Sequence, residues 1–222
     1  MTKKKGFIFD LDGVIVDTAH FHYLAWKNAA AIFGFELTEE LNEQLKGVSR
    51  IDSLHKILDW AGASISQERF DAITADKNIE YLQYVQKMTK DDILPGVYDF
   101  VSKVKEAGFP IALGSASKNA RAILAKVELL HLFDTIVDGT NVTKAKPDPE
   151  VFLIGASQLN CDPKDCIVFE DSVAGVSAAN AANMISIGIG SEDNLGHATF
   201  VYQDFTYFPD DLLEQLTEPV NN

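Results

Sequence analysis

The chain has 222 residues, of which 46% are hydrophobic and 23% are charged, a composition typical of a globular protein with one large domain or two small ones. Its formal net charge of -14 argues against nucleic acid as a partner, because binding to a phosphate backbone requires a basic surface. No apolar stretch is long enough to span a membrane, so we expect no membrane partner.

The start of the chain and its cysteines bear on the compartment. The basic residues near the N-terminus are followed by Asp10 and Asp12, which interrupt any apolar run, so we expect no signal peptide. The two cysteines, Cys161 and Cys166, are too few for a disulfide framework. Buried or incidental thiols in a reducing cytoplasm are the favoured interpretation, with a metal or redox pair as the alternative.

An apolar run at residues 7–9 predicts a buried strand that ends in two carboxylates, Asp10 and Asp12, followed by Gly13. Side chains two residues apart in a strand point the same way, so the two carboxylates would project together where Gly13 lets the backbone turn. One carboxylate can attack phosphorus and a neighbouring one can move a proton. Taken alone, this stretch is also compatible with a solvated acidic turn.

The next part of the chain predicts helices only. Thr18, Thr38, Ser49 and Ser66 are candidate N-caps for helices over residues 18–33, 38–47, 49–61 and 66–88. No strand is predicted between residues 18 and 90. We therefore expect a helical bundle at residues 18–90, called the cap below, inserted into a core formed by residues 1–17 and 91–222.

The remaining chain alternates between the two kinds of element. Strands are expected at residues 111–113, 135–137, 166–169, 184–187 and 200–202, and helices at residues 97–107, 120–129, 149–159, 173–182 and 211–216. This alternation predicts an α/β fold with a Rossmann-like parallel sheet covered on both faces. Ligands of such sheets bind at the carboxyl ends of the strands.

Several polar residues fall at those strand ends or in a nearby loop. Ser115 can hold phosphate oxygens together with backbone amides; the alternative is a plain helix cap, and the two roles are compatible. Glu170 and Asp171 could join Asp10 and Asp12 around a hard cation, or be an ordinary acidic helix start. Lys146 could bind phosphate, bridge the carboxylates or be a surface lysine, and its bond to Pro147 could be cis or trans.

These stretches together resemble the haloacid dehalogenase superfamily. The resemblance rests on the run Asp10-Leu11-Asp12-Gly13-Val14, then Ser115, Lys146 and Glu170-Asp171, in that order. Because Asp12 is present, the chain is similar to the phosphotransferases of that superfamily rather than to its dehalogenases. Residues 17–22, 42–50, 52–54, 77–78 and 115–119 further resemble the β-phosphoglucomutase family, whereas the tail after Asp193 departs most from it.

The resemblance implies roles for the core residues. Asp10 would be the nucleophile that becomes phosphorylated, and Asp12 would be the general acid and base. Thr18 and His22 would belong to the same catalytic group, with His22 coupling the position of the cap to Asp12. Mg²⁺ would be held by the Asp10 carboxylate, the Asp12 backbone carbonyl and Asp171, with Glu170 nearby. The transferring phosphoryl group would be held by Ser115, Ala116 and Lys146.

The resemblance also implies a substrate site. Arg50, Ser117 and Asn119 would bind the distal phosphate of a hexose phosphate. The sugar would be contacted, or the cap ordered, by Lys46, Gly47, Val48, Ser53 and Lys77. A guanidinium suits bidentate phosphate binding, and Arg50 at a helix start is not favoured by the helix dipole, which supports a ligand role. For His22, Lys46 and Lys77 the alternative is an ordinary helix side chain.

The implied activity is the interconversion of β-D-glucose 1-phosphate and D-glucose 6-phosphate through a phospho-aspartate enzyme and glucose 1,6-bisphosphate. A magnesium-dependent sugar-phosphate phosphatase is the alternative, since it needs the same core residues with water as the acceptor. A binding protein on an inactive fold is a third reading, and the complete set of Asp10, Asp12, Ser115, Lys146 and Asp171 argues against it. We expect a cytoplasmic monomer whose cap closes to exclude water.

Overall fold

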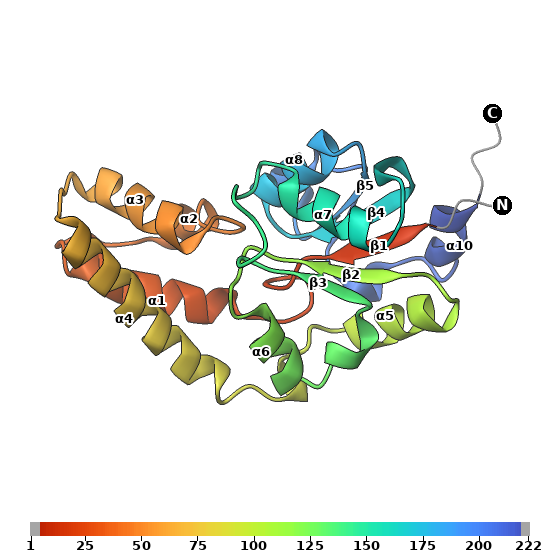
Figure 1. Cartoon of the computed structure of the whole chain (residues 1–222), viewed down its shortest axis with the longest axis horizontal. Helices are drawn as coiled ribbons and strands as arrows, with labels where there is room; N and C mark the ends of the chain where they lie inside the picture. Colours follow the sequence, from red (N-terminus) through yellow and green to blue (C-terminus); the bar gives the residue numbers. More distant parts are fainter. Residues whose placement is uncertain (1–4, 219–222) are drawn as a thin grey trace.

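A parallel sheet forms one part of the molecule and a group of helices forms the other in the computed structural model, which describes residues 5–218 (Figure 1). The six strands lie in the order β3-β2-β1-β4-β5-β6 and all neighbours are parallel. They span Gly6–Phe9 (β1), Ile111–Gly114 (β2), Thr135–Val137 (β3), Cys166–Glu170 (β4), Ile185–Ile189 (β5) and Phe200–Tyr202 (β6). The expected α/β fold is confirmed.

The first strand lies in the middle of the sheet, between β2 and β4. Its register pairs Phe9 with Leu113 on one side and with Phe169 on the other, so the three strands end at the same level. The strand order changes direction between β1 and β4, which is the point where open α/β sheets bind ligands. Residues that follow these strands therefore meet at one edge.

Each face of the sheet is covered by helices. Phe7 and Phe9 point to one face, where they form an apolar cluster with residues of α5 (Val97–Glu106), α6 (Ala120–Lys126) and α10 (Leu212–Thr217). Ile8 points to the other face and packs against α7 (Glu150–Gln158) and α8 (Val173–Ala181). This alternation is the strand period of two, and burial on both faces explains the apolar strands.

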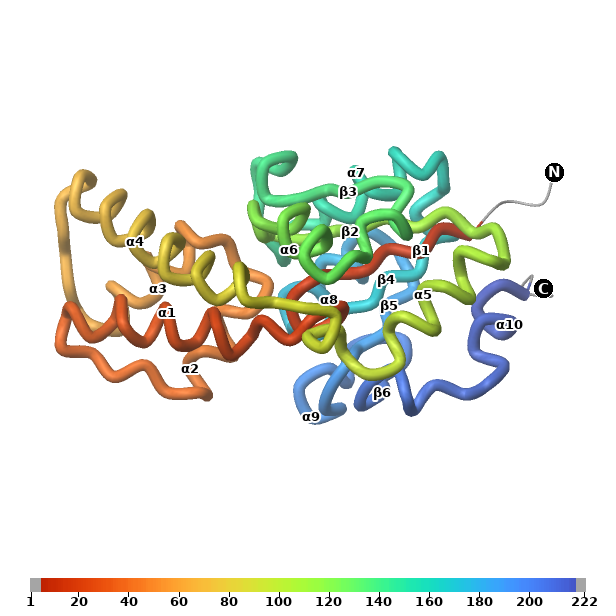
Figure 2. The backbone as a smooth tube through the Cα atoms, turned by 90° about the horizontal axis from the view of Figure 1, so that it is seen from below, coloured from red at the N-terminus to blue at the C-terminus, as the bar shows by residue number. Residues whose placement is uncertain are grey.

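The helical part contains α1 (Ala19–Ala31), α2 (Glu39–Glu43), α3 (Arg50–Ala61) and α4 (Gln67–Val85). These helices lie together beyond the end of the sheet in both views (Figures 1 and 2). They have an apolar cluster of their own, which includes Trp26, Leu54, Ile57 and Phe70. We keep residues 18–90 as the proposed extent of this helical unit.

Several local predictions can be compared with the structure. The hydroxyls of Thr38, Ser49 and Ser66 accept hydrogen bonds from backbone amides at the starts of α2, α3 and α4, as expected. Thr18 occupies the N-cap position of α1 as expected, but its side chain makes no cap hydrogen bond and its hydroxyl donates to Asp12 instead.

Some helix ends also differ. The helix expected to reach Gly47 ends at Glu43, because Gln44, Leu45 and Lys46 continue in tighter turns whose amides bond three residues back. The helices α4 and α6 end about one turn earlier than expected, and the short α9 (Glu192–Leu195) was not predicted. Within residues 5–218 neither Cys161 nor Cys166 forms a disulfide, and the Lys146–Pro147 bond is cis.

Within residues 5–218, no helix has the length and apolar character needed to cross a membrane.

Candidate active site

The two carboxylates after β1 line a cavity between the sheet edge and the helical unit. Asp10 and Asp12 both face it, as the strand alternation predicts. Gly13 follows with a φ of 84°, and a Cβ there would lie 2.1 Å from Asp171 Oδ2. The glycine is therefore required twice, by the backbone conformation and by the close approach of the Asp171 carboxylate.

Lys146 lies behind these carboxylates and is buried. Its Nζ donates to Asp10 Oδ1 at 2.6 Å, to Glu170 Oε1 at 2.5 Å and to the Gly114 carbonyl at 3.1 Å. Although burial opposes the charged form, the two carboxylates raise the pKa of Lys146 above its ordinary value, so the ammonium is kept. The interpretation of Lys146 as a surface lysine is wrong, whereas a bridge between carboxylates describes its contacts.

Both carboxylate oxygens of Glu170 accept hydrogen bonds from neighbouring residues of the core. Its Oε2 accepts from the amide and the hydroxyl of Ser172, both at 2.9 Å, while Oε1 accepts from Lys146. A Cβ at Gly175 would lie 1.9 Å from Glu170, so the start of α8 is built around this carboxylate. Glu170 thus anchors Lys146 and does not line the cavity.

The acidic residues fit a hard cation. Burial and neighbouring carboxylates raise the pKa of Asp171 well above its ordinary value, and they raise the pKa of Asp10 to about 7 despite Lys146. A cation would relieve this accumulation of negative charge. Within residues 5–218 no three His, Cys, Asp or Glu side chains form a metal cage. Mg²⁺ commonly takes one or two carboxylates together with waters and substrate phosphate, and Asp10 and Asp171 suit that mode.

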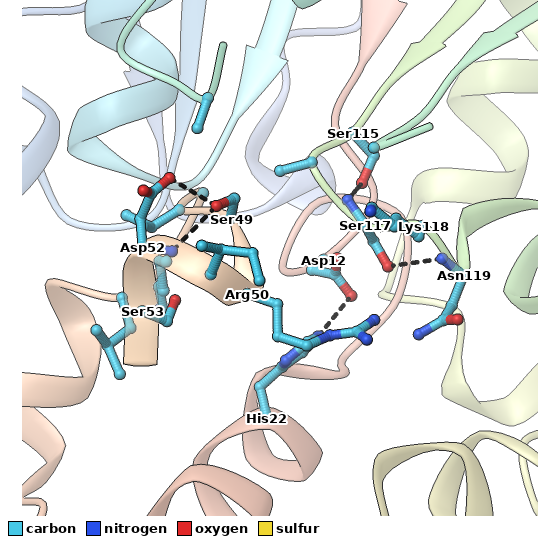
Figure 3. Close-up of a pocket in the computed structure, with 18 of the residues that line it drawn as sticks. Asp12, His22, Ser49, Arg50, Asp52, Ser53, Ser115, Ser117, Lys118 and Asn119 are labelled. Carbon is cyan, nitrogen blue, oxygen red and sulfur yellow. Dashed lines mark hydrogen bonds and ion pairs between the residues drawn. The ribbon is translucent and has the colours of Figure 1, made fainter. Parts of the chain in front are cut away.

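Asp12 has different surroundings from Asp10. Its Oδ1 accepts from the Thr18 hydroxyl, and His22 Nε2 lies 3.7 Å away (Figure 3). Burial would raise the pKa of Asp12, but His22, Thr18 and Lys77 together hold it below its ordinary value. These contacts favour the ionised form of Asp12, which can accept a proton.

A chain of contacts continues from Asp12 into the helical unit. Lys77 Nζ lies 2.9 Å from His22 Nδ1, and burial together with Arg50 lowers the pKa of Lys77 to about 7. A Lys77 ammonium can only donate, so in that form of Lys77 the Nδ1 atom accepts and the ring proton lies on Nε2, which faces Asp12. Tyr81, one helical turn after Lys77, packs against the His22 ring with centroids 4.1 Å apart and a tilt of 34°, and it places its hydroxyl 3.5 Å from Asp12.

The helical unit supplies the opposite wall. The cavity has a volume of about 440 Å³, and Figure 3 shows Arg50 and Ser53 on one side with Ser115, Ser117 and Asn119 on the other. The other predicted residues that line it are Asp10, Asp12, His22, Lys46, Gly47, Val48, Lys77, Ala116 and Asp171. Thr18, Lys146 and Glu170 are the three predicted residues that support the wall from behind.

Arg50 is the cap residue best suited to an anion. It is partly buried, and burial lowers the pKa of its guanidinium. Tyr81 has the opposite effect on this pKa, and no carboxylate contributes to the shift. Among residues 5–218 this partly buried cation has no ion pair with a carboxylate, so it is available for an anionic ligand.

The loop after β2 is fixed by its own hydrogen bonds. The Ser117 amide donates to Ser115 Oγ at 3.1 Å, and the Asn119 amide donates to Ser117 Oγ at 3.2 Å. Asn119 Nδ2 also donates to Asn78 Oδ1 at 3.0 Å, which joins the loop to α4. Ser115 therefore closes a turn in this loop and lines the cavity, whereas the N-cap position of α6 is occupied by Asn119, so Ser115 is not the helix cap.

Sequence reasoning left out some residues that line the cavity, among them Trp26, Asn78 and Lys118. It also left out Tyr81, whose spacing of four residues from Lys77 on a helix could have indicated the shared face.

Comparisons with known proteins identify the family of this chain and several related proteins. The family model of the haloacid dehalogenase-like hydrolases matches residues 4–183. A β-phosphoglucomutase of Bacillus subtilis is 40% identical over 84% of this chain and 83% of its own length. A phosphorylated carbohydrates phosphatase of Thermotoga maritima is 31% identical over 80% of this chain and 81% of its own. The crystal structure of a β-phosphoglucomutase from Clostridium difficile superimposes with a TM-score of 0.92 at 39% identity, covering 96% of this chain and 97% of that one.

Proposed function

We propose that this chain, which belongs to the haloacid dehalogenase-like hydrolase family, is a phosphomutase that interconverts β-D-glucose 1-phosphate and D-glucose 6-phosphate. The reaction would pass through a phosphorylated Asp10 and a glucose 1,6-bisphosphate intermediate. The resemblance to proteins named β-phosphoglucomutase supports this choice within the family.

The observation that carries the proposal is that one cavity has two different walls. The core wall holds the carboxylates Asp10 and Asp12, and the cap wall holds Arg50 and Lys77. A hexose bisphosphate has a phosphate at each end, so one end can stand at Asp10 while the other meets Arg50. A cavity of about 440 Å³ falls in the range of small-molecule sites.

In this proposal Asp10 attacks phosphorus, the bond from phosphorus to the sugar oxygen breaks, and Asp10 becomes an acyl phosphate while Asp12 gives a proton to the leaving oxygen. A sugar hydroxyl later attacks this phosphoryl group, gives its proton to Asp12 and releases the Asp10 carboxylate. Lys146 holds the Asp10 carboxylate at 2.6 Å and keeps its positive charge, so it can orient the nucleophile and offset negative charge on the transferring phosphoryl group. Ser115 and Ala116 line the same wall and would bind phosphoryl oxygens.

Asp12 would move the proton of the sugar hydroxyl. A hydroxyl is a poor nucleophile and a poor leaving group unless a proton moves with it. The Thr18 hydroxyl and the His22 ring hold the Asp12 carboxylate at the cavity wall, which keeps it within reach of a bound sugar. Because His22 also contacts Lys77, the position of Asp12 depends on the helical unit.

Mg²⁺ would be held by the carboxylates of Asp10 and Asp171 and by the backbone carbonyl of Asp12. When bound, it would supply charge neutralisation between the carboxylates and the phosphoryl group. Glu170 would contribute through Lys146 instead, since both of its oxygens already accept hydrogen bonds.

A sugar-phosphate phosphatase remains the second candidate, because a relative of that name shares 31% identity and the core residues suit both reactions. The two differ only in the acceptor of the phosphoryl group. Incubation with β-glucose 1-phosphate, Mg²⁺ and a trace of glucose 1,6-bisphosphate tests the proposal, with hexose 6-phosphate as the expected product. Release of glucose and inorganic phosphate alone would support the phosphatase.

A further inference from the structure

The loop after α2 brings a lysine of the helical unit against the core carboxylate Asp171. Lys46 Nζ lies 3.6 Å from Asp171 Oδ2 and 3.0 Å from Glu43 Oε2. The Asp171 side chain is 9% exposed and the Lys46 side chain is 26% exposed. The ion pair is therefore partly shielded from solvent, and it crosses the boundary between the two parts of the molecule.

Gly47 allows the loop that carries Lys46 to lie directly against the core. Its φ is 69°, and a Cβ there would lie 2.6 Å from Ser172 Oγ and 3.7 Å from Lys146 Cδ. The backbone next to Lys46 thus rests directly on the residue that follows Asp171, with no room for a side chain between them. The position of Lys46 depends on this docked loop.

Other cations near Asp171 are already engaged. Lys146 donates to Asp10, Glu170 and the Gly114 carbonyl. Among residues 5–218, the ion pair of Asp171 is the one with Lys46. An ammonium of the cap therefore neutralises the carboxylate to which the proposed function assigns Mg²⁺, and two cations at one carboxylate repel each other.

We propose that Lys46 is a counterion of Asp171 that Mg²⁺ displaces, so that binding of the cation loosens the docked cap and frees the ammonium for an anionic sugar phosphate. This inference rests on the magnesium site of the proposed function and adds a coupling between the cation and the cap. By linkage, a docked Lys46 must weaken Mg²⁺ binding by the same free energy that Mg²⁺ removes from docking. A substrate phosphate restores negative charge and favours closure again.

Calorimetric titration of the metal-free enzyme with Mg²⁺, without substrate, measures this coupling. Lys46→Met should bind Mg²⁺ at least ~5-fold more tightly than the wild type, the lower end of typical coupling. Lys46→Arg keeps the charge and should stay near the wild type. Lys27→Met removes the same charge from an exposed position of α1 outside the cavity, and it should also match the wild type.

A second variant separates the position of the ammonium from its charge. Gly47→Ala keeps Lys46 but places a methyl group against Ser172, which should undock the loop and tighten Mg²⁺ binding as Lys46→Met does. Small-angle scattering should show that Mg²⁺ expands the wild type, whereas Lys46→Met is already expanded without it.

Three outcomes would overturn the inference: equal Mg²⁺ affinity in Lys46→Met and the wild type, an equal gain in Lys27→Met, or tighter binding without any expansion. Failure of every variant to bind Mg²⁺ would overturn it together with the magnesium assignment. An enzyme with Lys46-dependent Mg²⁺ affinity that forms no hexose 6-phosphate would instead overturn only the mutase proposal.

Discussion

Replacing Asp12 with asparagine removes proton transfer and changes little else. The amide oxygen of the new side chain can still accept from the Thr18 hydroxyl, and the side chain keeps its size. The substitution removes the carboxylate that lies 3.7 Å from His22 Nε2, and with it the negative charge that interacts with Lys77. Because the proposed magnesium contact uses the backbone carbonyl, we expect unchanged Mg²⁺ binding and a folded protein.

General acid–base assistance typically contributes about 10²–10⁴-fold, so Asp12→Asn should slow isomerisation by at least about 10²-fold. That lower bound corresponds to about 2.7 kcal/mol of transition-state free energy. The assay follows hexose 6-phosphate formed from β-glucose 1-phosphate, with calorimetry for Mg²⁺ and for sugar phosphate. Asp17→Asn is the matched control, because Asp17 is exposed and does not line the cavity.

Two results would refute this reasoning about Asp12. Isomerisation within a few-fold of the wild type would mean that another group moves the proton. Loss of Mg²⁺ binding would mean that the Asp12 side chain is itself a ligand.

Other predictions concern the cap, the cation and the nucleophile. Arg50→Ala should lower kcat/KM for sugar phosphate by at least about 10²-fold yet leave Asp10 phosphorylation by acetyl phosphate intact, since remote binding orients the substrate; equal loss with both donors would assign Arg50 to the core chemistry. Chelation should abolish turnover and Mg²⁺ should restore it, so full activity in excess chelator would exclude the metal role. Burial and neighbouring carboxylates raise the pKa of Asp10 from 3.8 to about 7. The Asp10 carboxyl therefore binds a proton more tightly in the metal-free native state than in the unfolded chain, and the free energy of unfolding falls as pH rises from about 4 to about 7. Asp10→Asn lacks this titration, so its free energy of unfolding relative to the wild type should rise by up to about 4 kcal/mol between about pH 4 and about pH 7. A difference that stays constant over this pH range would contradict the burial argument.

The sequence alone predicts the core wall of the site well. Asp10, Ser115 and Asp171 follow apolar strands, and parallel strands end at one edge, so their meeting follows from topology. The strand alternation also predicts correctly that Asp10 and Asp12 face the same cavity.

Contacts between the cap and the core could not be predicted in this way. Thr18 has the residue type of an N-cap, but tertiary packing places the Asp12 carboxylate within its reach, and the side-chain hydrogen bond goes there. The pair of Lys46 and Asp171 joins residues far apart in the chain and depends on how the loop at Gly47 docks. No local pattern encodes such docking, because it is set by the shapes of both surfaces.

The most direct test of the mutase proposal is the fate of the phosphoryl group in ¹⁸O-labelled water. Wild-type enzyme would be incubated with β-glucose 1-phosphate, Mg²⁺ and a trace of glucose 1,6-bisphosphate, and the products analysed by mass spectrometry. We predict that hexose 6-phosphate without ¹⁸O in its phosphate greatly exceeds ¹⁸O-labelled inorganic phosphate, because the sugar hydroxyl is the acceptor. Labelled inorganic phosphate as the main product would mean that water is the acceptor, and it would contradict the proposed mutase activity.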